Sequence, residues 1–231
     1  MKRLFSTFLI ACIVLTISAQ NDDNEVKTLF GGKKDQSNGG YGAIMLGYSQ
    51  IWDRDAILIG ARGGWIINHN FAIGMGGYGF MTDPKTDTYI TDPITNKNSK
   101  YQITGGYGGL LFEPIIGAKQ PIHLSFPILV GAGGIAYTKH WETNEWDSYD
   151  YDYQQTYEDS DAFFVLEPGV ELEFNMLKFF RIALSASYRY TSNINLSYQE
   201  YRDPKPTPNV IGTQDMLRGM NYGIVFKFGR F

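Results

Sequence analysis

The sequence predicts an all-β chain that folds as an eight-stranded antiparallel up-and-down transmembrane β-barrel with a filled lumen. Three observations support this prediction. Segments of about 10 to 14 residues alternate apolar side chains with small or polar ones, as strands with two different faces do. Short and long connections alternate between these segments. Glycine accounts for 26 of 231 residues and aromatic residues for 15%, a composition typical of closely packed strands.

The chain begins with the features of a secretory signal peptide. Lys2 and Arg3 form a basic start, and the apolar stretch 4–19 ends in small residues. This stretch is shorter than the ~20 residues that a membrane-spanning helix needs. We therefore expect residues 1–19 to be a signal peptide that is cleaved after Ala19. The alternatives are an uncleaved anchor and lipid attachment at Cys12. The polar residues 20–38 predict a flexible N-terminal extension, followed by the barrel at 39–231.

The composition of the mature chain excludes several classes of protein. Cys12 is the only cysteine, so no disulfide stabilises the mature chain. Without Lys2 and Arg3, 18 basic residues face 24 acidic ones, which gives a net charge of −6 and no basic field to attract nucleic acid. No second apolar run approaches the length of a membrane-spanning helix, which excludes an α-helical membrane protein.

The eight predicted strands are, in chain order, 39–51, 55–67, 70–82, 100–113, 122–138, 161–174, 179–191 and 216–230. Long polar connections follow the third, fifth and seventh strands, and short turns follow the others. This asymmetry is typical of Gram-negative outer-membrane barrels, whose short turns face the periplasm and whose longer loops face outward. The first outward connection is the exception, because it has only about three residues between the predicted strands.

Charged residues share one face of the predicted strands with glycine, alanine and serine. In the segment DAFFVLEPGVELEF (161–174), three glutamates lie on one face of the predicted strand, and Leu166, Val170 and Phe174 lie on the other. A barrel of about eight strands has room inside only for side chains, and buried charges are tolerated when they are paired. We therefore predict a charge network in the lumen, with Glu171 and Glu173 beside Arg181. Its members are Arg62, Glu167, Glu171, Glu173, Arg181, Arg189 and Lys227.

Aromatic residues near the predicted strand ends suggest interfacial girdles. These are Trp52, Trp65, Tyr101, Tyr137, Trp141, Tyr188 and Tyr190. Two positions depart from a regular barrel. Pro168 has no N–H for the strand ladder, which predicts a bulge or a register break. Phe231 is out of phase with the apolar face of the last strand, which predicts an unusual C-terminal assembly signal or a bulge near Gly229.

The organisation resembles small outer-membrane β-barrels of the OmpA/OmpX type. The segments ARGGWIINHNF (61–71), HLSFPILVGAGG (123–134), FFVLEPGVELE (163–173) and ASYRY (186–190) are most similar to an uncharacterised family of short Gram-negative barrels. The resemblance implies a location in the cell outer membrane. It implies no catalytic residues and no cofactor, and we expect neither an enzyme nor a metal site.

The connection 139–161 carries eight acidic and six aromatic residues. It predicts either extended strands above the membrane or a surface that binds a protein, a glycan or lipopolysaccharide. Its candidate binding residues are Trp141, Trp146, Tyr149, Asp150, Tyr151, Asp152 and Tyr153. Aspartates in this connection have the oxygen ligands that Ca²⁺ prefers, although their spacing matches no EF-hand. The predicted function is a structural or surface-interaction role, and the alternatives are a narrow, porin-like channel and a lipid-modifying enzyme.

Overall fold

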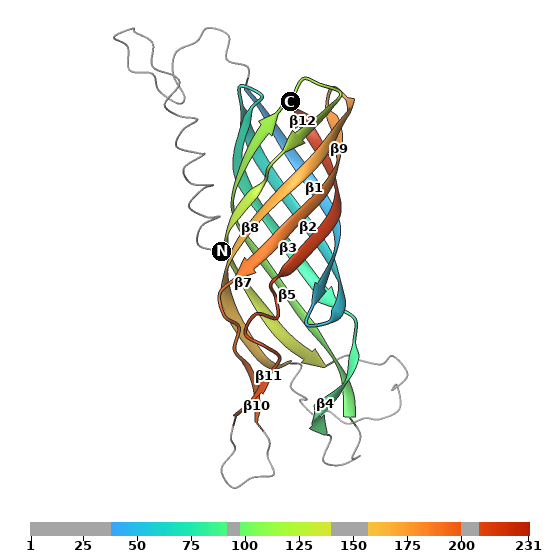
Figure 1. Ribbon diagram of the computed structural model, residues 1–231, viewed down its shortest axis with the longest axis vertical. Helices are drawn as coiled ribbons and strands as arrows, with labels where there is room; N and C mark the ends of the chain where they lie inside the picture. Colours follow the sequence, from blue (N-terminus) through green and yellow to red (C-terminus); the bar gives the residue numbers. More distant parts are fainter. Residues whose placement is uncertain (1–37, 92–97, 140–156, 200–207) are drawn as a thin grey trace, which may run out of the picture. The chain divides into compact units, whose positions relative to one another are not determined.

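The computed structural model describes residues 38–91, 98–139, 157–199 and 208–231. These residues form a closed all-β barrel (Figure 1). Within this part of the chain, no helix is long and apolar enough to span a membrane. The strands are β1 (Asn38–Ile51), β2 (Arg54–Ile67), β3 (Phe71–Thr82), β4 (Lys85–Thr91), β5 (Asn98–Ile116), β6 (Ile122–Ser125), β7 (Ile128–Lys139), β8 (Tyr157–Leu177), β9 (Phe180–Thr191), β10 (Leu196–Gln199), β11 (Pro208–Ile211) and β12 (Gly219–Arg230).

The barrel wall has eight positions and closes where β1 pairs with β12. Antiparallel pairing runs around the ring from β1 through β2, β3 and β5 to β7, β8, β9 and β12. Both β6 and β7 pair with β5 and β8, so together they fill one wall position. The predicted eight-stranded antiparallel barrel is confirmed.

The predicted strand 122–138 is divided at Phe126 and Pro127. Proline offers no ladder donor, and the carbonyl of Pro127 instead accepts the N–H of Gly169 at 2.8 Å. The register with β8 is the same on both sides of this interruption, from the pair Ile122–Phe174 to the pair Ile128–Pro168.

No register break occurs at Pro168 itself. The strand β8 continues through this residue, and the pairs Leu166–Tyr190 and Gly169–Ser187 keep one register with β9. Only Glu167 and Pro168, which lie between these two pairs, have no paired residue in β9. The register shift in this pair of strands lies further along, between Asn175 and Leu177. The N–H of the next residue, Gly169, is directed to Pro127 beside β7, so the nitrogen of Pro168 faces β9, where the ladder pairs are missing.

The predicted long connections contain strands of their own. Residues 83–99 include β4, which pairs with the start of β5, and residues 192–215 include the hairpin of β10 and β11. Both lie beyond the wall at the end away from the described termini (Figure 1). The opposite end has only short turns, and it is the periplasmic end of a barrel of this type.

Two turns use left-handed backbone at residues other than glycine. Trp52 and Asp53 join β1 to β2 with φ angles of 49° and 56°, and Asn68 and His69 join β2 to β3 with φ angles of 51° and 60°. Two consecutive left-handed residues match the twist of a tight hairpin. The turn at Trp52 and Asp53 explains why the first outward connection, between β1 and β2, is so short.

Candidate functional site

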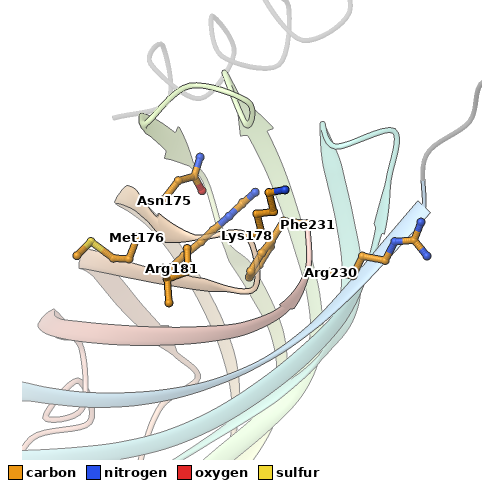
Figure 2. Close-up of a pocket in the computed structure, with 7 residues that line it drawn as sticks. Asn175, Met176, Lys178, Arg181, Arg230 and Phe231 are labelled. Carbon is orange, nitrogen blue, oxygen red and sulfur yellow. The ribbon is translucent and has the colours of Figure 1, made fainter.

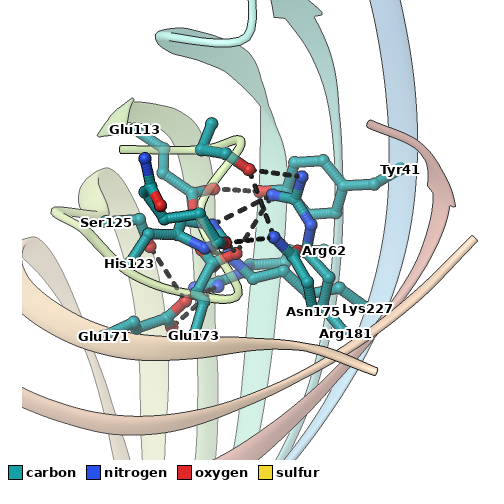
Figure 3. Close-up of polar contacts among 12 residues, drawn as sticks. Tyr41, Arg62, Glu113, His123, Ser125, Glu171, Glu173, Asn175, Arg181 and Lys227 are labelled. Carbon is teal, nitrogen blue, oxygen red and sulfur yellow. Dashed lines mark hydrogen bonds and ion pairs between the residues drawn. The ribbon is translucent and has the colours of Figure 1, made fainter. Parts of the chain in front are cut away.

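The periplasmic half of the lumen holds a buried ionic cluster centred on Lys227 (Figure 3). Its Nζ atom contacts carboxylate oxygens of Glu173 at 2.6 Å and of Glu171 at 2.9 Å, and it also pairs with Glu113. Lys227 is 2% exposed, and the three glutamates are fully buried. The hydroxyl of Tyr41 donates a further hydrogen bond to Glu113.

Two arginines complete this lumen cluster. Arg62 Nη2 donates to both carboxylate oxygens of Glu171, at 2.7 and 2.6 Å. Arg181 Nη1 donates to Glu173 at 3.3 Å, and His123 Nε2 lies 3.0 Å from the same carboxylate. Three carboxylates therefore face three permanent cations, which is the condition for burying charge without a large uncompensated cost.

Sequence reasoning missed Glu113, although the signal was present. Glu113 is the last residue of the predicted strand 100–113 and has the same parity as the lumen-facing Tyr107 and Leu111. Carboxylate atoms of Glu113, Glu171 and Glu173 lie within 4.8 Å of one another, a donor set suited to a hard cation. The ammonium group of Lys227 already lies among these oxygens.

A second polar group lies around Glu167, closer to the middle of the lumen. Its carboxylate accepts hydrogen bonds from Tyr107 at 2.5 Å, Ser187 at 2.6 Å and Asn221 at 3.0 Å. Neutral donors thus satisfy this charge, which the sequence had suggested would need a cation.

Arg189 lies in the lumen but takes no part in an ion pair among the described residues. Its Nε donates to the carbonyl of Leu217 at 2.7 Å, and its guanidinium carbon lies 5.6 Å from the Phe80 ring and 5.7 Å from the Tyr107 ring. A carbonyl and two aromatic faces attract a cation without supplying a formal charge. Only the location of Arg189 follows from strand parity, because parity carries no information about partners further along the barrel.

The lumen between these polar groups is almost completely filled. A void of about 10 Å³ remains beside Arg62 and Glu167, no more than the space of one water molecule. Further outward the interior becomes mostly apolar, with Leu58, Ile103, Ile135 and Val165 buried alongside Arg54 and Arg189. Residues after β9 then cover this outer end, because Ile194, Leu196, Ile211 and Leu217 are at most 1% exposed.

The outer surface of the wall is a continuous apolar band. Ile57, Ile59, Met75 and Phe164 are between 58% and 76% exposed, and similar side chains occur on every wall strand. A water-soluble protein rarely exposes so large an apolar surface. In lipid, such a band is required, and a closed barrel is one of two structures that satisfy every backbone group there. The chain folds as an outer-membrane β-barrel.

Comparisons with solved structures find barrels of the same type at low identity. The N-terminal barrel of OprF from Pseudomonas aeruginosa gives a TM-score of 0.42 at 11% identity, covering 84% of this chain and 99% of that one. Neisserial surface protein A gives 0.47 at 6% identity, with 84% and 99% covered. Ail of Yersinia pestis gives 0.40 at 12% identity, with 83% and 97% covered.

No family model and no curated protein sequence matches the chain. The resemblance to one particular family of short barrels therefore stays a prediction. The assignment as an outer-membrane barrel rests on the closed wall and its apolar band.

The predicted aromatic girdles are partly wrong. Trp65 and Tyr190 are 54% and 51% exposed on the outer surface, as girdle residues should be. Tyr101 and Tyr137 instead lie inside the outer-membrane barrel, where their rings stack with centroids 4.9 Å apart. Trp52 packs against the core. Proximity to a strand end suggested all of these positions, but strand parity decides the side of the wall.

The outer rim of the barrel is tied together by two aspartates of β8. Asp161 accepts the backbone N–H of Asn195 at 2.7 Å, and Asp159 accepts both the N–H and the hydroxyl of Ser197. These contacts fix the start of the β10–β11 hairpin against the extension of β8. The predicted binding residues of the acidic connection, Trp141, Trp146, Tyr149, Asp150, Tyr151, Asp152 and Tyr153, lie outside the described residues.

Proposed function

We propose that this outer-membrane barrel is a non-conducting scaffold that presents its outer rim for interaction with a ligand outside the cell. The observation that supports this proposal best is the filled lumen. A passage for solutes needs a continuous water-filled path, whereas the void beside Arg62 and Glu167 measures about 10 Å³. Functional contacts of a sealed barrel are then made at its rims or on its wall.

The outer rim has the composition of a binding surface. The connection 139–161 combines acidic and aromatic side chains, and loops held by a rigid scaffold commonly carry recognition. Asp159 and Asp161 also fix a second segment next to this connection. The proposed partners are a surface protein, a glycan, or a cation that bridges lipopolysaccharide.

Conductance in planar bilayers tests the sealed lumen. The refolded protein should give no current steps, with a water-filled porin as the positive control in the same bilayers. Reproducible steps that scale with the amount of protein inserted would contradict the scaffold and favour the narrow channel.

A loop replacement tests the role of the outer rim. Replacing residues 142–158 with a short Gly/Asn turn should leave a barrel that still migrates differently in SDS before and after boiling, because among the described residues it removes only the end pair of the β7–β8 ladder, Thr138 with Tyr157. The same change should abolish binding to glycan arrays or to proteins captured by the intact chain. Asp150→Asn with Asp152→Asn is the matched control that keeps the loop length, and it reproduces the loss only where a cation is involved.

An enzymatic role has a separate test. No catalytic constellation is present in the part of the chain that the structure describes. His140, the histidine of the long connection 139–161, lies outside it. Mass spectra of outer-leaflet lipid from cells with and without the protein should be identical. A mass change that depends on the protein would overturn the non-enzymatic proposal.

A further inference from the structure

A pocket of about 720 Å³ opens at the periplasmic end of the barrel, between the turn after β8 and the end of β12 (Figure 2). It is lined by Asn175, Met176, Leu177, Lys178, Arg181 and Phe231, and Arg230 lies at its margin. This pocket is separate from the outer rim, and the ionic cluster of the lumen reaches it only through Arg181.

Arg181 lies at the inner side of this periplasmic pocket, and one of its N–H groups is unpaired. It is 5% exposed, and its guanidinium carbon lies 3.8 Å above the centre of the Phe231 ring. Its Nη1 donates to Glu173 at 3.3 Å and lies 3.2 Å from His123 Nε2, and its Nη2 donates to the carbonyl of Ala118 at 3.5 Å. The buried Nε finds no hydrogen-bond partner among the described residues. An unsatisfied donor of a buried guanidinium is costly, and an acceptor entering the pocket would relieve it.

Phe231 takes this position because it is out of phase with the outward side chains of β12. The register with β1 continues to the pair Gly40–Arg230 without a shift, so no bulge at Gly229 corrects the phase. Phe231 therefore turns to the lumen side, where its ring also stacks on Tyr41 at 6.4 Å. The last residue of the sequence thus forms part of the pocket wall.

Charge is distributed unevenly between the two ends of the barrel. The periplasmic turns 68–70, 117–121 and 178–179 contain Lys119 and Lys178 and no carboxylate side chain. The other end is mixed, because Asp53, Asp55, Asp83, Asp159, Asp161 and Asp215 lie there together with Arg54, Lys85, Lys100 and Arg218. The glutamates nearest the pocket are already paired in the lumen cluster. The side chains that line the pocket therefore include three cations and no carboxylate.

The outer wall of the same pocket is apolar. Met176 and Leu177 are 55% and 56% exposed, and Phe179 beside them is 58% exposed. These side chains continue the apolar band of the barrel wall down to the periplasmic surface of the membrane. A ligand that fits has a compact anion on one side and hydrocarbon on the other.

We propose that this pocket binds the phosphate group of an anionic phospholipid in the periplasmic leaflet. Guanidinium groups present forked donors that match phosphate oxygens, and lysine adds a point charge. Arg181 and Lys178 contact the phosphate, Arg230 adds its charge at the margin of the pocket, and the acyl chains lie along Met176 and Leu177. The bound lipid ties the turn after β8 to the end of β12.

Native mass spectrometry of the full-length protein tests this site. The protein is released from micelles that contain phosphatidylglycerol or, separately, zwitterionic phosphatidylcholine, and the retained lipid is titrated. The intact protein should retain one phosphatidylglycerol in preference to phosphatidylcholine. Lys178→Gln with Arg230→Gln should weaken that binding about 25-fold, from about 1 kcal/mol for each cation near a membrane surface. Both side chains are exposed, so a heat-modifiable barrel should still form.

Lys119→Gln is the matched control, since Lys119 lies on the same rim but does not line the pocket. It should change the affinity by less than about threefold, because an exposed charge further away is screened by salt. Equal weakening by this control, or unchanged binding in the double variant, would overturn the site. Inorganic phosphate that displaces the lipid completely would overturn the lipid assignment and indicate a site for soluble phosphate.

Discussion

Replacing Lys227 with methionine should be one of the most destabilising single changes in the barrel. The ammonium group lies 2.6 Å from Glu173 and 2.9 Å from Glu171, and it also pairs with Glu113. At 2.9 Å and an effective dielectric constant near 20, each such pair attracts by about 6 kcal/mol before desolvation is subtracted. Removing one partner of a buried pair has a net cost of about 3 to 5 kcal/mol. Because Lys227 serves three carboxylates, we expect a loss of about 5 kcal/mol.

Urea unfolding in detergent micelles measures this loss. The folded and unfolded fractions are separated by their different electrophoretic mobility in SDS. With a slope near 2 kcal/mol per molar urea, a loss of about 5 kcal/mol lowers the midpoint by about 2.5 M. Methionine keeps much of the lysine stem's volume, so the change removes charge and leaves the packing largely intact. Lys178→Met is the matched control: that lysine is exposed, and it should move the midpoint by less than about 0.3 M.

A second substitution distinguishes the ionic cluster from a general loss of packing. Glu113→Gln removes the carboxylate whose only cationic partner among the described residues is Lys227, while Glu171 keeps Arg62 and Glu173 keeps Arg181. The double variant of Lys227 and Glu113 should therefore be more stable than Lys227→Met alone. Pairing Lys227→Met with Glu167→Gln should instead give additive losses, because Glu167 belongs to the other polar group. A midpoint shift below about 0.5 M for Lys227→Met, or additivity with Glu113→Gln, would refute the reasoning.

Three further tests concern the wall, a turn and the processing of the chain. Gly109→Ala should lower stability by about 1 to 3 kcal/mol in the same urea assay, because its Cβ would lie 2.1 Å from the carbonyl oxygen of Val130. Gly42→Ala, with nothing within 4 Å, should be neutral or slightly stabilising; equal losses would contradict the close approach. His69→Gly should raise stability by about 1 kcal/mol, because its φ of 60° suits glycine better, and a loss would show that the imidazole holds the turn. Mass spectrometry of the protein from outer membranes should find a mature terminus at Gln20, whereas lipid-modified Cys12 would refute the predicted cleavage.

Strand parity accounts for most of what the sequence predicted correctly. The alternation around Glu167, Glu171 and Glu173 assigns one face of β8 to the lumen, and the same rule places Arg62, Arg181 and Lys227 there. Parity works because the period of a strand is two and one face of every wall strand meets lipid. It needs no knowledge of which strands are neighbours.

Partners across the lumen were beyond such reasoning. Arg62 on β2 meets Glu171 on β8, and Glu113 on β5 meets Lys227 on β12, yet none of these strands are adjacent in the wall. Which charges meet depends on the stagger of the strands around the barrel, and a sequence pattern does not fix that stagger. For Tyr101 and Tyr137 the information was in the sequence. Strand parity places them inside the barrel, but their position near strand ends led to the wrong prediction that they lie in the girdle.

The lumen cluster also limits what the barrel can do by changing shape. A path through the periplasmic half must separate Arg62 from Glu171 and Lys227 from its carboxylates. Each unpaired buried charge costs about 3 to 5 kcal/mol, whereas a folded domain is stable by only about 5 to 15 kcal/mol in total. Opening two such pairs would therefore use most of the stability of the barrel before any solute entered. The mostly apolar outer half would remain closed as well, because its side chains come from different strands and fill the lumen independently of the ionic cluster. A change of state in this protein is therefore expected at the outer rim or the periplasmic pocket, where side chains reach solvent, and not along the axis of the barrel.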